Sequence, residues 1–170
     1  MQITIHPMNL PDWPSVAQIY QQGIDTGNAT FAHCPQESWQ EWSKGKINEC
    51  SLVAKEGDAI LGWAALSPIS NRCVYRGVAE ISLYITASAR GQGVGQGLMV
   101  ALIECSEAHG IWTLQAGIFQ ENTGSRQLHL NNGFRILGIR EGLGLMTFGP
   151  YQGQWRDVAF LERRSKIAGN

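Results

Sequence analysis

The chain has 170 residues, of which 44% are apolar and 16% are charged, and its formal net charge is −1. A chain of this length and composition can bury a core without metal ions or disulfides, so we expect a single domain over residues 1–170. Its near-neutral charge gives no general attraction to nucleic acid or to an anionic membrane, and neither is an expected partner.

The first half of the chain is predicted to combine short strands with two helices. One helix is expected from Asp12, as its cap, to about residue 23, and another over residues 35–47, where Trp39 and Trp42 share one side. The predicted strands are apolar or alternating runs bounded by turn residues, at residues 3–6, 52–55, 59–68 and 79–85.

The second half is predicted to continue the alternation of helices and strands. A helix over residues 98–109 ends before Gly110, as a C-terminal glycine cap requires. The remaining predicted elements are a strand at 112–117, a helix at 122–132 and two strands at 134–142 and 153–163 joined by a loop rich in Gly and Pro. This order predicts an α/β fold with a mixed sheet.

The cysteine pattern predicts reduced thiols. Cys34, Cys50, Cys73 and Cys105 have no paired spacing, which favours free thiols over a disulfide framework or a zinc site. The N-terminal segment lacks the basic start and apolar core of a signal peptide, and no stretch approaches the roughly 18 apolar residues of a membrane span. We therefore expect a cytoplasmic protein that holds no metal.

Residues 90–97, Arg-Gly-Gln-Gly-Val-Gly-Gln-Gly, are the most informative segment. They lie between a predicted strand and a predicted helix, so their glycines allow a close approach of the backbone to a ligand, and amide N–H groups at the helix start suit a pyrophosphate. The alternative is a flexible surface loop. A Walker loop would end in Gly-Lys-Ser/Thr, and a Rossmann turn would lie near the first strand of a βαβ unit, so neither fits.

The spacing Arg90-x-x-Gly93-x-Gly95 resembles the acetyl-CoA pyrophosphate loop of the GNAT-superfamily N-acetyltransferases. A second block, Asn122-x-x-Ser125-x-x-x-His129-x-x-x-Gly133-Phe134, is similar to the next block of that superfamily and comes in the right order. The resemblance covers the whole chain. It implies a mixed, mostly antiparallel sheet of about seven strands with flanking helices and a splay between the fourth and fifth strands.

The resemblance also implies a set of residues that bind acetyl-CoA as co-substrate. The backbone of the central strand would hold the pantetheine arm in the splay, the glycine segment would hold the pyrophosphate, and polar residues of the second block would hold the arm or reach a phosphate. The residues implied are Leu83, Tyr84, Ile85, Arg90, Gly91, Gln92, Gly93, Val94, Gly95, Gln96, Gly97, Asn122, Ser125 and Arg126.

Acetyl transfer to an amine needs a group that removes a proton and a group that returns one to the leaving thiolate. Glu80 lies in an otherwise apolar strand, where a partly buried carboxylate facing a cavity would be a good proton acceptor near neutral pH. The alternative is a strand glutamate that faces solvent or pairs with an arginine. His129 matches the position where many relatives carry a tyrosine that serves as general acid, and the alternative is a structural histidine.

A narrower resemblance concerns the acceptor. Tyr75-Arg76-x-x-x-Glu80 and the closing Gly153-x-Trp155-x-Asp157-Val158 look like the branch that acetylates phosphinothricin and methionine sulfoximine. This implies a small amino-acid-like acceptor, with Arg76 as the partner of its carboxylate, Tyr75 beside it and Phe31 as a wall of the side-chain pocket. The alternatives are a solvated loop arginine and a core phenylalanine.

Residues 141–150 depart from the branch, because they are richer in glycine and apolar residues than the usual connection. An exposed Leu-Met-Phe tract there would suit a homodimer interface.

Three functions stay open. They are an N-acetyltransferase of small amino acids, a protein or peptide N-acetyltransferase, and a non-catalytic acyl-CoA-binding module.

Overall fold

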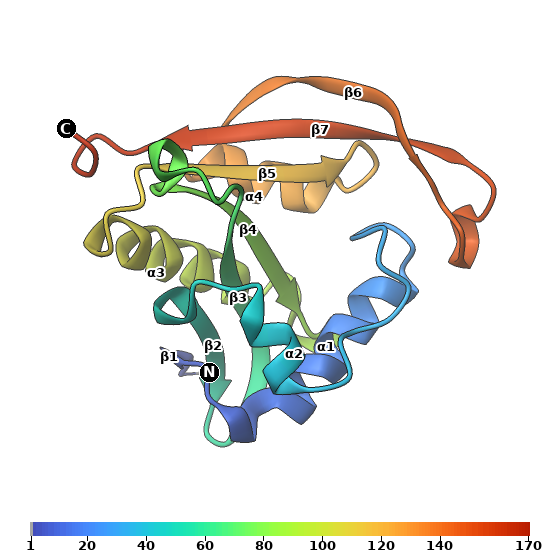
Figure 1. Ribbon diagram of the computed structural model, residues 1–170. Coiled ribbons are helices and arrows are strands. Elements are labelled where there is room, and N and C mark those ends of the chain that lie inside the picture. The colour runs from blue at the N-terminus through green and yellow to red at the C-terminus, as the bar shows by residue number, and fades with distance from the viewer. Residues whose placement is uncertain (1) are drawn as a thin grey trace.

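The computed structural model describes residues 2–170 and shows one seven-stranded sheet (Figure 1). The strands are β1 (Thr4–Pro7), β2 (Ser51–Glu56), β3 (Ala59–Pro68), β4 (Val78–Ile85), β5 (Thr113–Phe119), β6 (Arg135–Leu145) and β7 (Trp155–Arg164). Their order in the sheet is β1-β2-β3-β4-β5-β7-β6. Neighbouring strands are antiparallel except β4 and β5, which are parallel. The predicted mixed, mostly antiparallel sheet is therefore confirmed.

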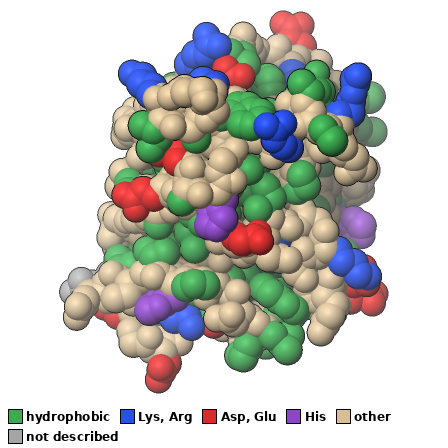
Figure 2. All heavy atoms as spheres, turned by 60° about the vertical axis from the view of Figure 1, so that its left-hand side comes forward, with side chains coloured by type: hydrophobic (Ala, Val, Ile, Leu, Met, Phe, Trp, Pro, Cys, Tyr) green, Lys and Arg blue, Asp and Glu red, His purple; other side chains and the backbone are tan. Residues whose placement is uncertain are grey.

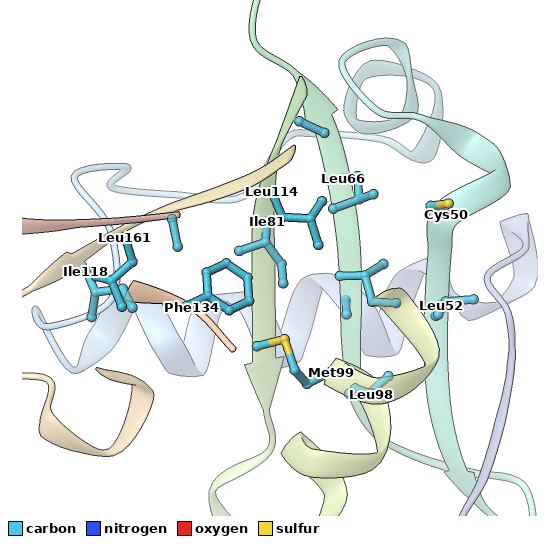
Figure 3. Packing of buried hydrophobic residues seen from close by; sticks show 14 of the residues in the cluster. Cys50, Leu52, Leu66, Ile81, Leu98, Met99, Leu114, Ile118, Phe134 and Leu161 are labelled. Carbon is cyan, nitrogen blue, oxygen red and sulfur yellow. The ribbon is translucent and has the colours of Figure 1, made fainter. Parts of the chain in front are cut away.

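Four α-helices cover the two faces of this sheet: α1 (Trp13–Asp25), α2 (Trp39–Lys44), α3 (Val94–Ala108) and α4 (Thr123–Asn131). Successive strand residues point to opposite faces, so Val53 and Trp63 pack with α1 and α2, whereas Leu66 packs with α3. Figure 3 shows Leu98 and Met99 of α3 beneath the side chains that the strands contribute to this larger core.

The sheet opens between β4 and β5. The two strands pair over only three residue pairs, from Val78 with Thr113 to Glu80 with Gln115, although β4 continues to Ile85 and β5 to Phe119. On its other side, β4 stays paired with β3 up to Ile85. The predicted splay thus begins directly after Glu80, and the edge of β4 that faces β5 is left without a strand partner there.

Several element bounds differ from the prediction for local reasons. Helix α2 is shorter than predicted because it begins after Ser38 and not at Pro35. Ser38 caps its start by accepting a hydrogen bond from the Glu41 N–H at 3.2 Å. Helix α3 begins four residues earlier than predicted, at Val94, so half of the glycine segment belongs to its first turn. Strand β6 continues to Leu145, into the stretch predicted as a loop.

The prediction that Asp12 caps α1 is wrong. Asp12 precedes the helix but makes no capping hydrogen bond to it. Its carboxylate instead accepts hydrogen bonds from the Asn9 N–H at 2.9 Å and from the Lys55 ammonium at 2.8 Å. The cation of β2 competes successfully for the buried carboxylate, and a local sequence pattern does not contain that contact.

Strand β6 is one of the two outer strands of the sheet and arches together with β7 over one end of the molecule (Figure 1). Its apolar side chains Ile136, Leu137, Ile139, Leu143 and Leu145 are between 40% and 48% exposed. Of the Leu-Met-Phe tract that was predicted to be exposed, Leu145 is exposed and Phe148 is partly buried, whereas Met146 is buried with Phe119 and Val158 in a small separate core.

Charged side chains of both signs are interspersed on the face shown in Figure 2, in keeping with the near-zero net charge. Among residues 2–170, no helix has the length and apolar character needed to cross a membrane.

Candidate active site

Two cavities meet at the splay. The first, of about 390 Å³, lies toward β6 and the segment after α2, and the second, of about 630 Å³, lies toward the glycine segment and α4. Both are lined by the five residues Ala29, Leu83, Tyr84, Asn122 and Ser125. A ligand that follows the free edge of β4 from the second cavity therefore reaches the first at Leu83 and Tyr84.

The glycine segment, residues 90–97, forms one end of the second cavity. Gly91 and Gly93 have φ angles of +74° and +85°, a left-handed conformation that favours glycine. A Cβ atom at either position would meet open space, so the glycines are required by backbone conformation and not by crowding. Gly93 makes no side-chain cap, which leaves the first N–H groups of α3 available to an anion.

The residues of the glycine segment divide into two groups. Those lining the second cavity are Arg90, Gly91, Gly93, Gly95 and Gln96. The other three residues are absent from the lining: the Gln92 amide donates to the Ser88 carbonyl at 2.7 Å, Val94 is buried in the core, and Gly97 packs toward Ile5.

The strand and helix residues predicted to bind the pantetheine arm lie together at the junction. Ile85 lines the second cavity, and Leu83 and Tyr84 line both cavities. Asn122 is fixed on two sides, because its Oδ1 accepts from the Ser125 N–H at 3.3 Å and its Nδ2 donates to the Asn28 carbonyl at 3.1 Å. The second predicted block thereby ties the start of α4 to the loop after α1.

Glu80 lines the first cavity at the point where β4 and β5 part. It is exposed, so the expectation of partial burial is wrong; the charge is tolerated in an apolar strand because it faces the cavity. Lys46 lines the same cavity and donates to the Ser67 hydroxyl at 3.1 Å. Burial lowers the pKa of Lys46, and the negative charge of Glu80 acts in the opposite direction.

His129 also lines the first cavity and is only 3% exposed. Its Nδ1 lies 2.7 Å from the Ser125 carbonyl, which can only accept, so Nδ1 carries the proton of that hydrogen bond. Its Nε2 is buried and has no protein partner among the described residues. Burial lowers the pKa of His129, so the neutral ring presents an Nε2 lone pair that can accept a proton.

Aromatic residues form part of the lining of the first cavity. Phe31 lines the first cavity and packs edge-to-face on Phe119, with ring centroids 4.9 Å apart. Tyr84 packs on Tyr20 at 4.9 Å, and burial raises the pKa of both phenols, which keeps them neutral. The first cavity is therefore lined by aromatic rings together with a carboxylate, an imidazole and two cationic side chains.

Besides Gln92, Val94 and Gly97, three more predicted site residues are not brought to either cavity. Arg76 lies over the Trp112 ring at 5.4 Å and donates to the Cys73 carbonyl at 3.3 Å, and neighbouring Tyr75 is exposed on the same turn. Arg126 donates to the Gln120 carbonyl at 3.0 Å. None of the three is among the residues that line the two cavities.

Two arginines that sequence reasoning missed support the first cavity. Arg140 of β6 lines it, with its guanidinium over the Phe160 ring at 4.3 Å. Arg156 of β7 is 2% exposed and donates to the Gly27 carbonyl at 2.6 Å and to Asn28 Oδ1 at 2.8 Å. Arg156 thereby fixes the loop after α1 that carries Phe31. Its neighbours Trp155 and Asp157 belong to the closing motif noted in the sequence, but no local pattern indicates that Arg156 is buried.

Comparison with known proteins agrees with this arrangement. The profile of the acetyltransferase (GNAT) family matches residues 13–134. A phosphinothricin N-acetyltransferase of Alcaligenes faecalis is 31% identical over 166 residues, covering 94% of this chain and 81% of that protein. An L-methionine sulfoximine/L-methionine sulfone acetyltransferase of Pseudomonas paraeruginosa is 28% identical over 167 residues, covering 95% of this chain and 94% of that protein.

The similarity extends to the fold. A GNAT-superfamily phosphinothricin acetyltransferase from Sinorhizobium meliloti, solved in complex with acetyl-CoA, superposes with a TM-score of 0.86 at 28% identity, covering 99% of this chain and 91% of that one. The family profile covers most of the chain, from α1 to the start of β6. The chain therefore belongs to the GNAT family of N-acetyltransferases.

Proposed function

We propose that this enzyme transfers an acetyl group from acetyl-CoA to the primary amine of a small amino-acid-like acceptor of the phosphinothricin or methionine sulfoximine type. The observation that carries the proposal is the meeting of two cavities at Leu83 and Tyr84, with Glu80 and His129 lining only the first. The donor enters by the second cavity and the acceptor by the first, so the two reacting groups meet at the splay. The names of the relatives support the acceptor class.

The second cavity suits the donor because its features follow the parts of acetyl-CoA in order. The free N–H groups at the start of α3, with Arg90 beside them, suit the pyrophosphate. The unpaired edge of β4 at residues 83–85 suits the amides of the pantetheine arm, which can pair with it as a further strand does. The acetyl group then lies near Asn122 and Ser125.

The first cavity suits an acceptor that carries an anionic group. Arg140 and Lys46 both line it, and a guanidinium is well suited to bind a carboxylate with two hydrogen bonds. Arg76 lies outside this lining and stacks on Trp112, so we assign the carboxylate to Arg140 and Lys46 in its place. Phe31 and the tyrosines bound the space left for the acceptor side chain.

Proton transfer is assigned to Glu80 and His129. The acceptor enters as an ammonium group and must lose a proton before its nitrogen attacks the thioester carbonyl; the exposed Glu80 carboxylate takes this proton directly or through water. The leaving thiolate must gain one. His129 Nε2, neutral and unpartnered, accepts a proton from the attacking nitrogen and passes it to the thiolate.

Release of free CoA from acetyl-CoA against a panel of acceptors tests the proposal. The panel contains phosphinothricin, methionine sulfoximine, methionine sulfone, standard amino acids, polyamines, aminoglycosides and short peptides. The first three are expected to give the highest kcat/KM. Faster turnover of peptides would instead show a protein or peptide N-acetyltransferase, and tight acetyl-CoA binding with no turnover on any acceptor would show a binding module.

We also propose that two copies associate through β6. The support is the row of partly exposed apolar side chains on this outer strand, since a long apolar edge strand is a common site of pairing.

A further inference from the structure

Two cysteines far apart in the sequence meet outside the active site. Cys50 Sγ lies 2.6 Å from Cys105 Sγ, although the two residues are 55 positions apart in the chain. A disulfide bond is about 2.05 Å long, so roughly half an ångström of movement separates this contact from a covalent bond. Both residues are free cysteines, as expected from the sequence, and neither lines either of the two cavities.

The pair joins two elements that the fold holds in contact. Cys50 ends the short turn before β2 and is fully buried in the main core, where Figure 3 shows it near Leu52 and Leu66. Cys105 lies in the last turn of α3, and its thiol donates to the Glu49 carbonyl at 3.1 Å. A covalent bond between the two sulfurs would therefore tie the end of α3 to the start of β2.

The two sulfurs differ in their access to solvent. Cys105 is partly exposed, whereas Cys50 is buried and its burial raises the pKa of its thiol. A small oxidant in solution therefore reaches Cys105 first, and the Cys50 thiol is the neighbour that can react with the oxidised sulfur. His109 Nδ1 lies 3.6 Å from Cys105 Sγ but donates its proton to the Cys105 carbonyl at 2.8 Å, so we assign this histidine no part in the chemistry.

We propose that Cys50 and Cys105 are a site of reversible oxidation, at which a peroxide converts the two thiols into a disulfide. The Cys105 sulfur attacks one peroxide oxygen, the O–O bond breaks, and Cys105 becomes a sulfenic acid with release of one water molecule. The Cys50 sulfur then attacks the Cys105 sulfur, and the hydroxyl group leaves with the Cys50 proton as a second water molecule. The two thiols lose two electrons in total, and the peroxide gains them.

The bond is reversed by a dithiol, which is itself oxidised to a disulfide by thiol–disulfide exchange. While the bond is present, it closes a long loop of the chain and so reduces the conformational entropy of the unfolded state. We therefore expect the oxidised protein to be the more stable form. This inference concerns residues separate from both cavities and holds whether or not the proposed function does.

Thiol counts test the bridge in a Cys34→Ser/Cys73→Ser background, which lacks the two exposed cysteines. The reduced background protein should show two thiols when denatured, and none after treatment with hydrogen peroxide and removal of the excess. Mass spectrometry should then show a single chain that has lost two hydrogen atoms, with the peptides that carry Cys50 and Cys105 linked. Cys105→Ser in the same background is the matched control, and its buried Cys50 should keep its thiol.

Thermal unfolding gives a second measurement. The oxidised background protein should melt roughly 5 to 15 °C above the reduced one, and a dithiol should restore both the thiols and the lower Tm. Cys105→Ser, whose partly exposed position makes it well suited to fold normally, should show no such rise. The proposal is overturned if both thiols survive the peroxide, if oxygen is added to Cys105 without a link to Cys50, or if the link forms only between two chains. A bridged protein whose Tm is not raised would overturn the stabilising role.

Discussion

The hydrogen bond between His129 Nδ1 and the Ser125 carbonyl decides which chemistry this residue can perform. It fixes the tautomer, so Nε2, the ring nitrogen without a hydrogen-bond partner among the described residues, is the unprotonated one. The family resemblance implied that His129 donates a proton, as the tyrosine at this position does in many relatives. The structure favours a residue that first accepts one, because burial lowers its pKa and no described side chain pairs with Nε2.

Burial of His129 predicts a loss of stability in mild acid. As the pH falls below 6.5, the ordinary pKa of the ring, the unfolded chain takes up a proton while the folded protein does not. Between pH 6.5 and the lower pKa of the folded protein, the free energy of unfolding therefore decreases as the pH falls. Above pH 6.5 this group does not affect it. Urea unfolding of wild type and His129→Asn over this window measures the difference.

The variant should lose that part of the pH dependence, whereas His33→Asn, at an exposed histidine, should keep it. Parallel curves for wild type and His129→Asn would show that the ring is not held neutral by burial.

Glu80→Gln should lower kcat at neutral pH by about 100- to 10,000-fold, the range typical of a lost general base. Part of the rate should return at higher pH, where more of the acceptor is already a free amine. Acetyl-CoA affinity should stay near the wild-type value, because Glu80 does not line the second cavity. Steady-state rates across pH and calorimetric titration with acetyl-CoA measure both effects.

Glu104→Gln, at an exposed glutamate of α3, is the control. A Glu80→Gln enzyme with the wild-type pH profile would assign the carboxylate a structural role.

Among single residues, the acceptor cation was the hardest to find from sequence. Arg76 lies close to Glu80 in the chain, so a motif could include it, but the turn that carries it faces Trp112. Arg140 reaches the first cavity through the pairing of β6 with β7, in which it lies opposite Val158, another residue of the cavity lining. Local patterns carry no information about such a long-range register.

At the level of elements, the glycine segment was the most predictable part of the site. Its conformation depends on the residues within it, since Gly91 and Gly93 adopt left-handed angles that favour glycine. Helix α2 and the end of β6 were less predictable, because a capping serine and a partner strand set their limits.

Gly93→Asp should abolish acetyl-CoA binding while the protein stays folded. The added carboxylate would repel the pyrophosphate at the start of α3 and its Cβ would occupy the approach. Gly57→Asp is the matched control, because Gly57 also has a positive φ, of +59°, and open space around its Cβ position. Both variants place Asp at a positive φ with open space around the Cβ position, and only the first should lose affinity by calorimetry. Equal affinities in two folded variants would remove the segment from the donor site.

For the whole molecule, composition and the alternation of elements predicted the α/β class, and the family resemblance supplied the strand count and the splay. The faces of β2 and β3 follow from the two-residue period of their side chains. The arrangement of β6 did not follow, because its exposed apolar residues gave no alternating pattern. That exposure is itself informative about assembly.

The β6 surface predicts a homodimer that charge can dissociate. Leu137 and Leu145 are 45% and 43% exposed, so a double change of both to Lys should leave the fold intact and place like charges at the contact. Sedimentation velocity should show a dimer for wild type and a monomer for this variant. Val100→Lys, at a 40% exposed position on α3, should remain dimeric. A monomeric wild type, or a dimeric double variant, would exclude β6 as the interface.

The most direct test of the account compares methionine sulfone with its decarboxylated amine as acceptors, in wild type, Arg140→Ala and Arg76→Ala. If the first cavity binds an amino-acid acceptor through Arg140, that variant should lose about one to two decades of kcat/KM on methionine sulfone and little on the amine. Arg76→Ala should leave kcat/KM unchanged on both acceptors. Equal proportional losses on both acceptors in Arg140→Ala, or a selective loss in Arg76→Ala, would contradict the assignment.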